Sequence, residues 1–176
     1  GIAGERLATA VAQNGGLGLI ALTEIGYQEP DYDRHPVQAN KRAIKRKVSE
    51  ACRILSESGK SGLIGVNIMW NTDNAHEYVQ TAVKAGARVV VTSAGMPQNL
   101  PKYITDKRVA LVPTVSTARG ARAIITSWSR RYNRVPDAFI LQGPNAAGLL
   151  GFKEEHLDFA MQEWHKTILE VKSELS

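Results

Sequence analysis

The sequence predicts an α/β protein built around a parallel β-sheet. Short runs of β-branched and other apolar residues alternate with segments whose apolar residues have the spacing of an amphipathic helix. Successive strand candidates are mostly separated by roughly twenty to thirty residues, which is the pattern of consecutive βαβ units with right-handed crossovers. Because 176 residues are enough for one domain with its own core, we expect residues 1–176 to form a single domain.

Five segments are candidate strands. They are residues 17–21, 63–69, 88–93, 109–115 and 138–142. Most are nearly continuous in apolar residues, which is typical of strands buried on both faces of a parallel sheet. Because consecutive strands usually lie side by side in such folds, we expect all five to be parallel and to follow one another across the sheet in chain order.

Five further segments have helical periodicity. They are residues 5–13, 39–58, 73–85, 117–131 and 153–175. The first three are followed by a glycine within one or two positions (Gly15, Gly59 and Gly86), and glycine is a common residue just beyond the end of a helix. The last segment carries apolar residues at helical spacing along its whole length, so it predicts one outer helix packed against the core.

One long segment, residues 22–38, shows neither the apolar pattern of a strand nor that of a helix. It follows the first strand and contains four acidic residues and two prolines. A loop of this length at the carboxyl end of a strand is typical of a functional lid or of a disordered stretch, and both interpretations stay open here.

The composition limits the class of protein. Apolar content of 43% and charged content of 22% are ordinary for a soluble globular protein. No apolar run approaches the ~20 residues that a membrane span needs, and no signal-peptide pattern is present. The single cysteine, Cys52, rules out an internal disulfide framework and fits a reducing compartment, so we expect a cytoplasmic protein. Its neighbours place Cys52 on the buried face of a helix, where a catalytic thiol is not expected.

The net charge of +5 raises the question of nucleic-acid binding, but the distribution of charge argues against it. The densest basic run, residues 41–47, lies in a predicted helix whose apolar residues Ile44, Val48 and Cys52 follow helical spacing. The basic residues then form the solvated face of that helix, where contact with an anion stays open. No aromatic residues are interleaved to stack on bases, so we expect no nucleic-acid partner and no membrane partner.

Polar residues stand at the carboxyl ends of the later strands, where parallel α/β folds bind their ligands. Asn67, Ser93, Thr114 and Gln142 would form a neutral, hydrogen-bonding rim. Asn67 lies in an apolar run, so its amide must find either a local partner or a ligand. Residues 142–152 form a loop of mostly small residues, which is either a plain turn or a place where the backbone closely approaches a ligand. Such a rim suits a flat heteroaromatic cofactor better than a metal.

The sequence contains no motif for a metal site, a nucleophile elbow or a nucleotide-binding loop. The four histidines have no i, i+4 spacing and none stands at a strand end, so we expect no metal site. The Gly-x-Ser-x-Gly motif of a nucleophile elbow and the Walker motif are both absent. The glycine-rich run at residues 15–18 precedes its strand, whereas a dinucleotide-binding loop follows one.

Five motifs taken together resemble the nitronate monooxygenase family, also called 2-nitropropane dioxygenase-like. They are residues 14–20, 65–67, 90–95, 111–115 and 137–143, in matching order and approximate spacing, and the similarity runs from about residue 4 to residue 152. The family consists of FMN-binding (β/α)8 TIM barrels and includes flavin-dependent enoyl-ACP reductases. The resemblance implies an FMN-dependent oxidoreductase that acts on a small molecule, a nitronate or an enoyl-type substrate.

The resemblance also implies a set of residues at the cofactor. Asn67, Gln142, Gly143 and Gly148 would lie against FMN, and Ser93 and Thr114 would lie near it. The family has a histidine near the flavin that serves as catalytic base or polar partner, and Leu149 stands at that position here. A leucine cannot accept a proton, so the resemblance leaves the catalytic residue unknown.

The chain also differs from the family in how much of the barrel it contains. The resemblance implies that residues 1–176 hold about five of eight barrel strands and are incomplete at both ends. Five strands would leave two unpaired edges and an exposed apolar inner face, so we expect a homo-oligomer or completion by further chain. The family holds the FMN phosphate on later loops, so we expect this segment alone to bind FMN weakly or not at all.

Two alternatives stay open. A catalytically silent relative that uses the barrel as a binding or structural protein would explain Leu149. An unrelated open sheet of flavodoxin-like topology would suit five strands in a chain of this length, and it would show a strand order with a switch point.

Overall fold

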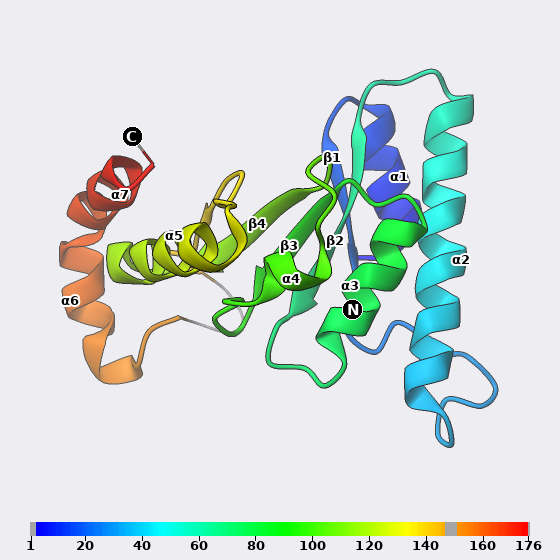
Figure 1. Cartoon of the computed structure of the whole chain (residues 1–176), viewed down its shortest axis with the longest axis horizontal. Helices are drawn as coiled ribbons and strands as arrows, with labels where there is room; N and C mark the ends of the chain where they lie inside the picture. The colour runs from blue at the N-terminus through cyan, green and yellow to red at the C-terminus, as the bar shows by residue number, and fades with distance from the viewer. Residues whose placement is uncertain (1–2, 147–150, 176) are drawn as a thin grey trace.

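The computed structural model describes residues 3–146 and 151–175. Five parallel strands form a sheet in the order β1-β2-β3-β4-β5 (Figure 1). They are β1 (Leu17–Ala21), β2 (Leu63–Met69), β3 (Val89–Ser93), β4 (Ala110–Val115) and β5 (Ile140–Leu141). The order expected from the sequence is confirmed, and the doubly wound order of a flavodoxin-like sheet is wrong for this chain.

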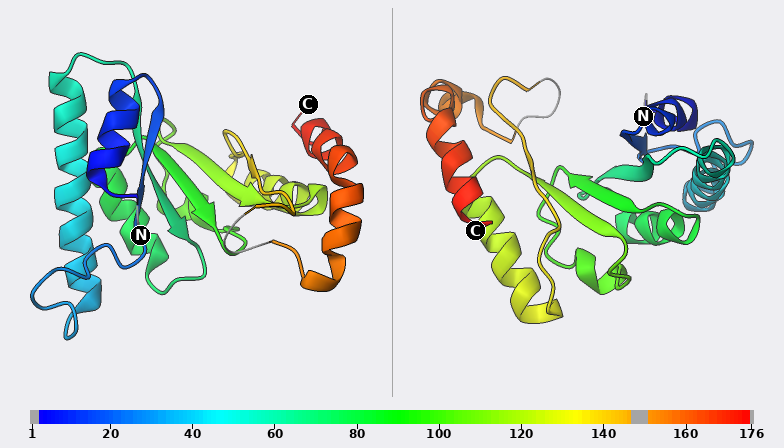
Figure 2. Two further views of the ribbon diagram at one scale, coloured as in Figure 1. Left: turned by 180° about the vertical axis from the view of Figure 1, so that it is seen from behind. Right: turned by 90° about the horizontal axis from the view of Figure 1, so that it is seen from above.

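The helices lie outside a curved sheet. They are α1 (Glu5–Gln13), α2 (Pro36–Glu57), α3 (Ala75–Lys84), α4 (Leu100–Tyr103), α5 (Ala118–Tyr132), the 3-10 helix η1 (Glu154–His156), α6 (Leu157–Gln162) and α7 (Trp164–Ser173). Seen from above, the strands form an arc with α2, α3, α4 and α5 along its outer side (Figure 2). This is the arrangement of strands and outer helices found in a (β/α) barrel, except that the five described strands form an arc that does not close.

The fifth strand and the last helix differ most from the sequence-based expectation, and the short α4 was not expected. The fifth strand is only two residues long, because Asp137 pairs with β4 irregularly. The Asp137 N–H donates to the Leu111 carbonyl at 3.1 Å, and the Leu111 N–H donates to the Asp137 carboxylate Oδ2 at 2.8 Å. The expected last helix is broken at Glu163, between α6 and α7. There the chain turns so that the Trp164 ring packs on Gly143 and lies edge-on to Phe152, with centroids 6.4 Å apart. Tertiary contacts therefore override the local helical periodicity.

Burial alternates along β1 and β4. Residues that face the helices, such as Ile20, Val66 and Leu111, are fully buried. Among the residues of the other face, Leu17, Leu63 and Ile140 keep 41%, 48% and 40% of their surface exposed. In the described residues the apolar runs are thus buried on the helix side, whereas on the inner side the central strand buries Val89 and Val91 and the residues named above stay partly exposed.

Helix α1 packs against the sheet with backbone-to-backbone contact. A Cβ atom at Gly18 of β1 would lie 1.9 Å from the carbonyl oxygen of Ala8, and a Cβ atom at Gly62 would lie 1.9 Å from the carbonyl oxygen of Ala12. Any side chain at these two positions would push the helix away from the sheet. Glycine is therefore a packing requirement here, on the side of α1 that buries Ala8 and Ala12.

The segment before α2 is an ordered series of turns. Leu22 and Ile25 are buried in the core, and the Gly26 N–H donates to Oδ1 of buried Asn40 at 2.7 Å. None of residues 22–38 lines the cavity described below. The segment is thus ordered and held against α2, and its interpretation as a lid stays a prediction.

The basic run of α2 is largely ion-paired. The pairs are Lys41–Glu77 at 2.8 Å, Arg42–Asp31, Arg46–Glu29 at 2.5 Å and Lys47–Glu5 at 3.3 Å. The positive charge of this helix is thus compensated by acidic residues of α1, α3 and the segment before α2. No helix within the described residues has the length and apolar character needed to cross a membrane.

Candidate functional site

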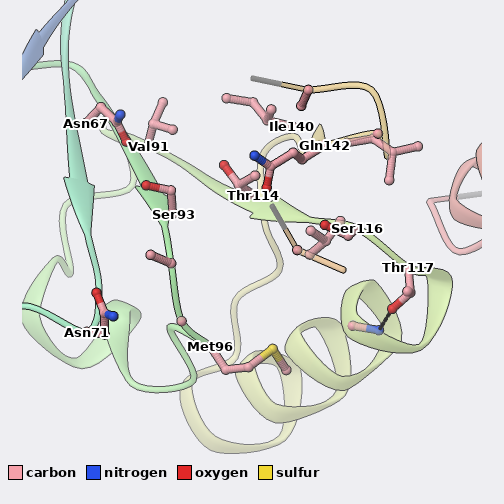
Figure 3. A pocket seen from close by; sticks show the side chains of 18 of the residues that line it. Asn67, Asn71, Val91, Ser93, Met96, Thr114, Ser116, Thr117, Ile140 and Gln142 are labelled. Carbon is pink, nitrogen blue, oxygen red and sulfur yellow. Dashed lines mark hydrogen bonds between the residues drawn. The ribbon is translucent and has the colours of Figure 1, made fainter. Parts of the chain in front are cut away.

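A cavity of about 930 Å³ lies at the carboxyl ends of β2 to β5 (Figure 3). Its volume is in the range of small-molecule sites, roughly 300–1,000 Å³. The lining residues come from the inner face of the strands and from the loops that follow them. They are Leu19, Asn67, Asn71, Val91, Ser93, Ala94, Gly95, Met96, Thr114, Val115, Ser116, Thr117, Gly120, Ile140, Leu141, Gln142, Gly143, Ala146 and Gly151.

The rim residues expected from the sequence meet at this cavity. Asn67, Ser93, Thr114, Gln142 and Gly143 all line it, and they come from four neighbouring strands or the residues just beyond them. Gly148 and Leu149 lie outside the described residues. The convergence of the five is a structural fact, and their contact with FMN stays a prediction.

Strand register explains why these side chains share one face. In the parallel ladder Asn67 is paired with Val91, Met69 with Ser93, and Thr114 with Ile140. Side chains alternate between the two faces of a strand, so Ile68 and Thr92 point to the helices and are buried there. Figure 3 shows Asn67, Ser93, Thr114 and Gln142 following one another across the sheet.

The cavity is electrically neutral and holds an unused acceptor. Among the described residues that line it, none carries a titratable side chain. The Asn67 Oδ1 atom is buried and has no hydrogen-bond partner among the described residues. A buried acceptor without a partner costs about 1–3 kcal/mol. The site therefore favours a ligand that offers a hydrogen-bond donor to Asn67.

The loop after β3 brings strained backbone to the mouth of the cavity. Ala94 has φ 48° and Gly95 has φ 139°, both in the left-handed region. The loop is tied to the end of β2, because the Trp70 N–H donates to the Ser93 carbonyl at 2.6 Å and the Asn71 N–H donates to the Ala94 carbonyl at 3.0 Å. Such conformations persist where the surroundings hold them, and they are common at ligand sites.

Other lining residues were not expected from the sequence. Asn71, Met96 and Ser116 lie in the loops beyond the strand ends, where periodicity carries no information about direction. Thr117 also lines the cavity, and it caps α5: its Oγ1 accepts from the Gly120 N–H at 3.1 Å. The small residues after several strands were the one signal that these loops approach a ligand.

The described part of the site contains no titratable side chain that could donate or accept a proton in catalysis. Within residues 3–146 and 151–175, no three histidine, cysteine, aspartate or glutamate residues are close enough together to hold a metal ion. The single cysteine lies on α2, away from the cavity lining. The described site can thus bind and orient a ligand, and it supplies no acid or base.

Cys52 is expected to react slowly with alkylating reagents. Burial raises the pKa of its thiol, and nearby Arg88 lowers it by less. A higher pKa means less thiolate at any pH below it, and the thiolate is the reactive form. Iodoacetamide labelling followed by mass spectrometry should show a rate at least about fivefold below that of a cysteine in an unstructured peptide, rising towards higher pH. Labelling at the peptide's rate would contradict the packing around α2.

The chain matches one family model and several solved structures. The family model described as nitronate monooxygenase matches residues 1–173. A mutant of FabK from Thermotoga maritima is similar with a TM-score of 0.62 and 21% identity, over 85% of this chain and 42% of that one. FabK without that change gives a TM-score of 0.58 and 22% identity, over 85% and 40%. No curated protein matches.

A third solved structure covers more of the chain. A nitroalkane oxidase from Streptomyces ansochromogenes is similar with a TM-score of 0.62 and 17% identity, over 99% of this chain and 53% of that one. At these identities the likeness concerns the fold alone, and the five strands with their helices form part of a TIM-type barrel. The chain spans between 40% and 53% of the length of these structures.

Proposed function

The chain belongs to the nitronate monooxygenase family, and we propose that its cavity forms the polar side of the cofactor site of an FMN-dependent oxidoreductase. The observation that carries the proposal is the convergence of Asn67, Ser93, Thr114, Gln142 and Gly143 on one cavity of about 930 Å³. The substrate would be a small molecule, a nitronate or an enoyl-type compound.

The lining residues fit a flavin. The unpartnered Oδ1 of Asn67 accepts a hydrogen bond, and a flavin ring carries an N–H donor. Leu19, Val91 and Ile140 offer apolar surface to a flat ring. Gly143 lines the cavity as well, and a Cβ atom there would lie 2.9 Å from the Trp164 ring, so this position has no room for a side chain.

Each group in the cavity has a distinct task in this proposal. Asn67 and Gln142 orient the cofactor through their amides, and the hydroxyl groups of Ser93 and Thr114 add hydrogen bonds. The apolar residues exclude water from the face on which a substrate lies. Bound FMN would supply hydride transfer, because the isoalloxazine ring itself carries that chemistry.

The lack of a titratable side chain among the described lining residues bears on the choice of reaction. Nitronate oxidation of the family's type relies on a histidine near the flavin, and Leu149 stands at that position in the sequence. Hydride transfer to an enoyl-type substrate must be followed by protonation of the α carbon, and water would supply that proton where no side chain does. The same observation favours a second candidate, a catalytically silent relative that binds a flat ligand without turnover.

The absorbance of the full-length protein tests the proposal. We expect the purified protein to be yellow and to release FMN on denaturation, identified by mass spectrometry. Reduction of the bound flavin by a nicotinamide donor, followed by reoxidation with an enoyl thioester, would identify enoyl reduction. Reduction of the flavin by a nitronate, followed by reoxidation with O2, would identify nitronate oxidation. A flavin that binds and is never reduced would favour the silent relative, and a full-length protein that takes up no flavin under any condition would rule out the proposal.

We also propose that the inner face is covered in the whole protein, by further chain or by a second copy. Leu17, Leu63 and Ile140 expose about half of their surface there, and β1 and β5 form the edges of the described sheet. Exposed apolar faces and unpaired edges favour association. Light scattering that shows a stable monomer of residues 1–176 alone, without binding of a hydrophobic dye, would contradict this.

A further inference from the structure

The outer face of α5 carries a second groove, of about 450 Å³, which we call the arginine groove. It is lined by Gln98 and by seven residues of α5: Arg119, Arg122, Ala123, Thr126, Ser127, Arg130 and Arg131. These recur at intervals of three and four positions, so they form one stripe along the helix. Ala121, Ile124 and Trp128 occupy the opposite side of α5 and are buried.

The groove concentrates positive charge, and three of its four arginines have no ion-pair partner among the described residues. Arg119, Arg130 and Arg131 are exposed, and within residues 3–146 and 151–175 they form no ion pair or side-chain hydrogen bond. Arg122 is paired with Glu174, which directly follows α7, and Glu170 of α7 lies near enough to act on Arg122 as well. This contrasts with α2, where most basic residues already pair with acidic ones. The charge on α5 is thus available to a partner.

The groove is shallow, and the residues that form it are held in place by the fold. Its middle is made of the small side chains of Ala123, Thr126 and Ser127, so another backbone can come close. The Ser127 Oγ atom is buried and has no hydrogen-bond partner among the described residues. The wall at Gln98 is anchored, because the buried indole N–H of Trp128 donates to the Pro97 carbonyl at 2.8 Å. The groove therefore exists before a partner binds.

We propose that the arginine groove binds an acidic helix of a partner protein. Arg119 and Arg130 are eleven positions apart, which is about 16 Å along a helix and matches carboxylates placed over three turns of a partner helix. One small anion could not contact both ends. Arginine forms bidentate bonds with carboxylates, so several such pairs give both affinity and register.

Two further observations support this choice. No aromatic residue lines the groove for base stacking, and the ion-paired α2 does not extend the positive surface, so a nucleic acid finds neither of its usual contacts. Thr117 and Gly120 of the same helix line the cavity. A partner seated on α5 would therefore lie beside the entrance of the proposed cofactor site.

Fluorescence anisotropy with a defined probe tests the inference in the full-length protein. The probe is a fluorescein-labelled, alanine-rich helical peptide with glutamate at every fourth position, and its control carries glutamine instead. The test variant combines Arg119→Gln, Arg130→Gln and Arg131→Gln. A matched variant combines Lys45→Gln, Lys60→Gln and Lys84→Gln, which removes the same charge from exposed residues outside the groove.

We expect the glutamate peptide to bind saturably and the glutamine peptide not to bind. The groove variant should weaken binding by at least about tenfold, and the matched lysine variant by less than about threefold. Equal losses in the two variants, or no saturable binding, would overturn the inference. So would a labelled single-stranded oligonucleotide that binds more tightly than the peptide and depends on the same arginines. Flavin content is measured in each variant, which keeps this result separate from that of the cofactor proposal.

Discussion

Gly18→Ala is expected to destabilise the protein by about 3 kcal/mol or more. The new Cβ atom would lie 1.9 Å from the carbonyl oxygen of Ala8, and that oxygen belongs to helix backbone, which cannot rotate away like a side chain. Helix α1 would have to move off the sheet and uncover Ala8 and Ala12. Overpacking of a well-packed core costs about 1–3 kcal/mol, and a backbone clash lies at the upper end of that range or above it. Urea unfolding followed by circular dichroism measures the change.

Gly120→Ala is the matched control. It makes the same substitution in α5, where the nearest atom to the new Cβ is Oγ1 of Thr117 at 3.4 Å, an ordinary contact. Alanine has the higher helix propensity, so we expect a gain of about 0.5–1 kcal/mol. If Gly18→Ala unfolds at the same urea concentration as the wild type, then α1 does not pack on β1 as described.

Asn67→Leu is expected to have opposite effects on stability and on cofactor binding. Leucine has a similar size and removes the buried Oδ1 acceptor that has no partner among the described residues. The free energy of unfolding of the cofactor-free protein should rise by about 1 kcal/mol. Flavin affinity should fall by at least about tenfold, because a hydrogen bond to the ligand is lost. Thermal unfolding and flavin fluorescence titration measure the two effects in the full-length protein.

Thr92→Val separates the two effects. The Thr92 Oγ1 atom is also buried and without a partner in the described part of the chain, but this side chain points to the helices and does not line the cavity. Valine has nearly the same shape, so we expect a similar gain in stability and an unchanged flavin affinity. An unchanged affinity in Asn67→Leu as well would remove Asn67 from the cofactor site, whatever its effect on stability.

The sequence alone determined the order and direction of the strands. Each strand from β1 to β4 is a compact apolar run with a helix after it, and short right-handed crossovers leave few other arrangements. It also determined which polar residues share a face. Asn67, Ser93, Thr114 and Gln142 stand at or near the carboxyl ends of parallel strands, and parallel strands bring these ends to one edge of the sheet.

The ends of the elements were less well determined. The sequence pattern continues as a helix through Glu163, yet the chain breaks there because Trp164 packs on Gly143, a residue 21 positions earlier. The four-residue α4 is too short to show a period. The fifth strand is short because the Asp137 side chain takes a backbone partner on β4. Each of these depends on contacts between distant residues, which a local pattern does not contain.

Only the tertiary structure decided which charges are free and which faces are covered. The basic residues of α2 and α5 look alike in the sequence, but acidic residues from three other elements pair with those of α2, while Arg119, Arg130 and Arg131 find no partner among the described residues. In the same way, apolar strands that the sequence predicts to be buried on both faces are buried on the helix side and covered only in part on the inner side, where Leu17, Leu63 and Ile140 stay exposed. Ion pairing and burial depend on which distant residues the fold places next to a side chain, and a local sequence pattern does not contain that information.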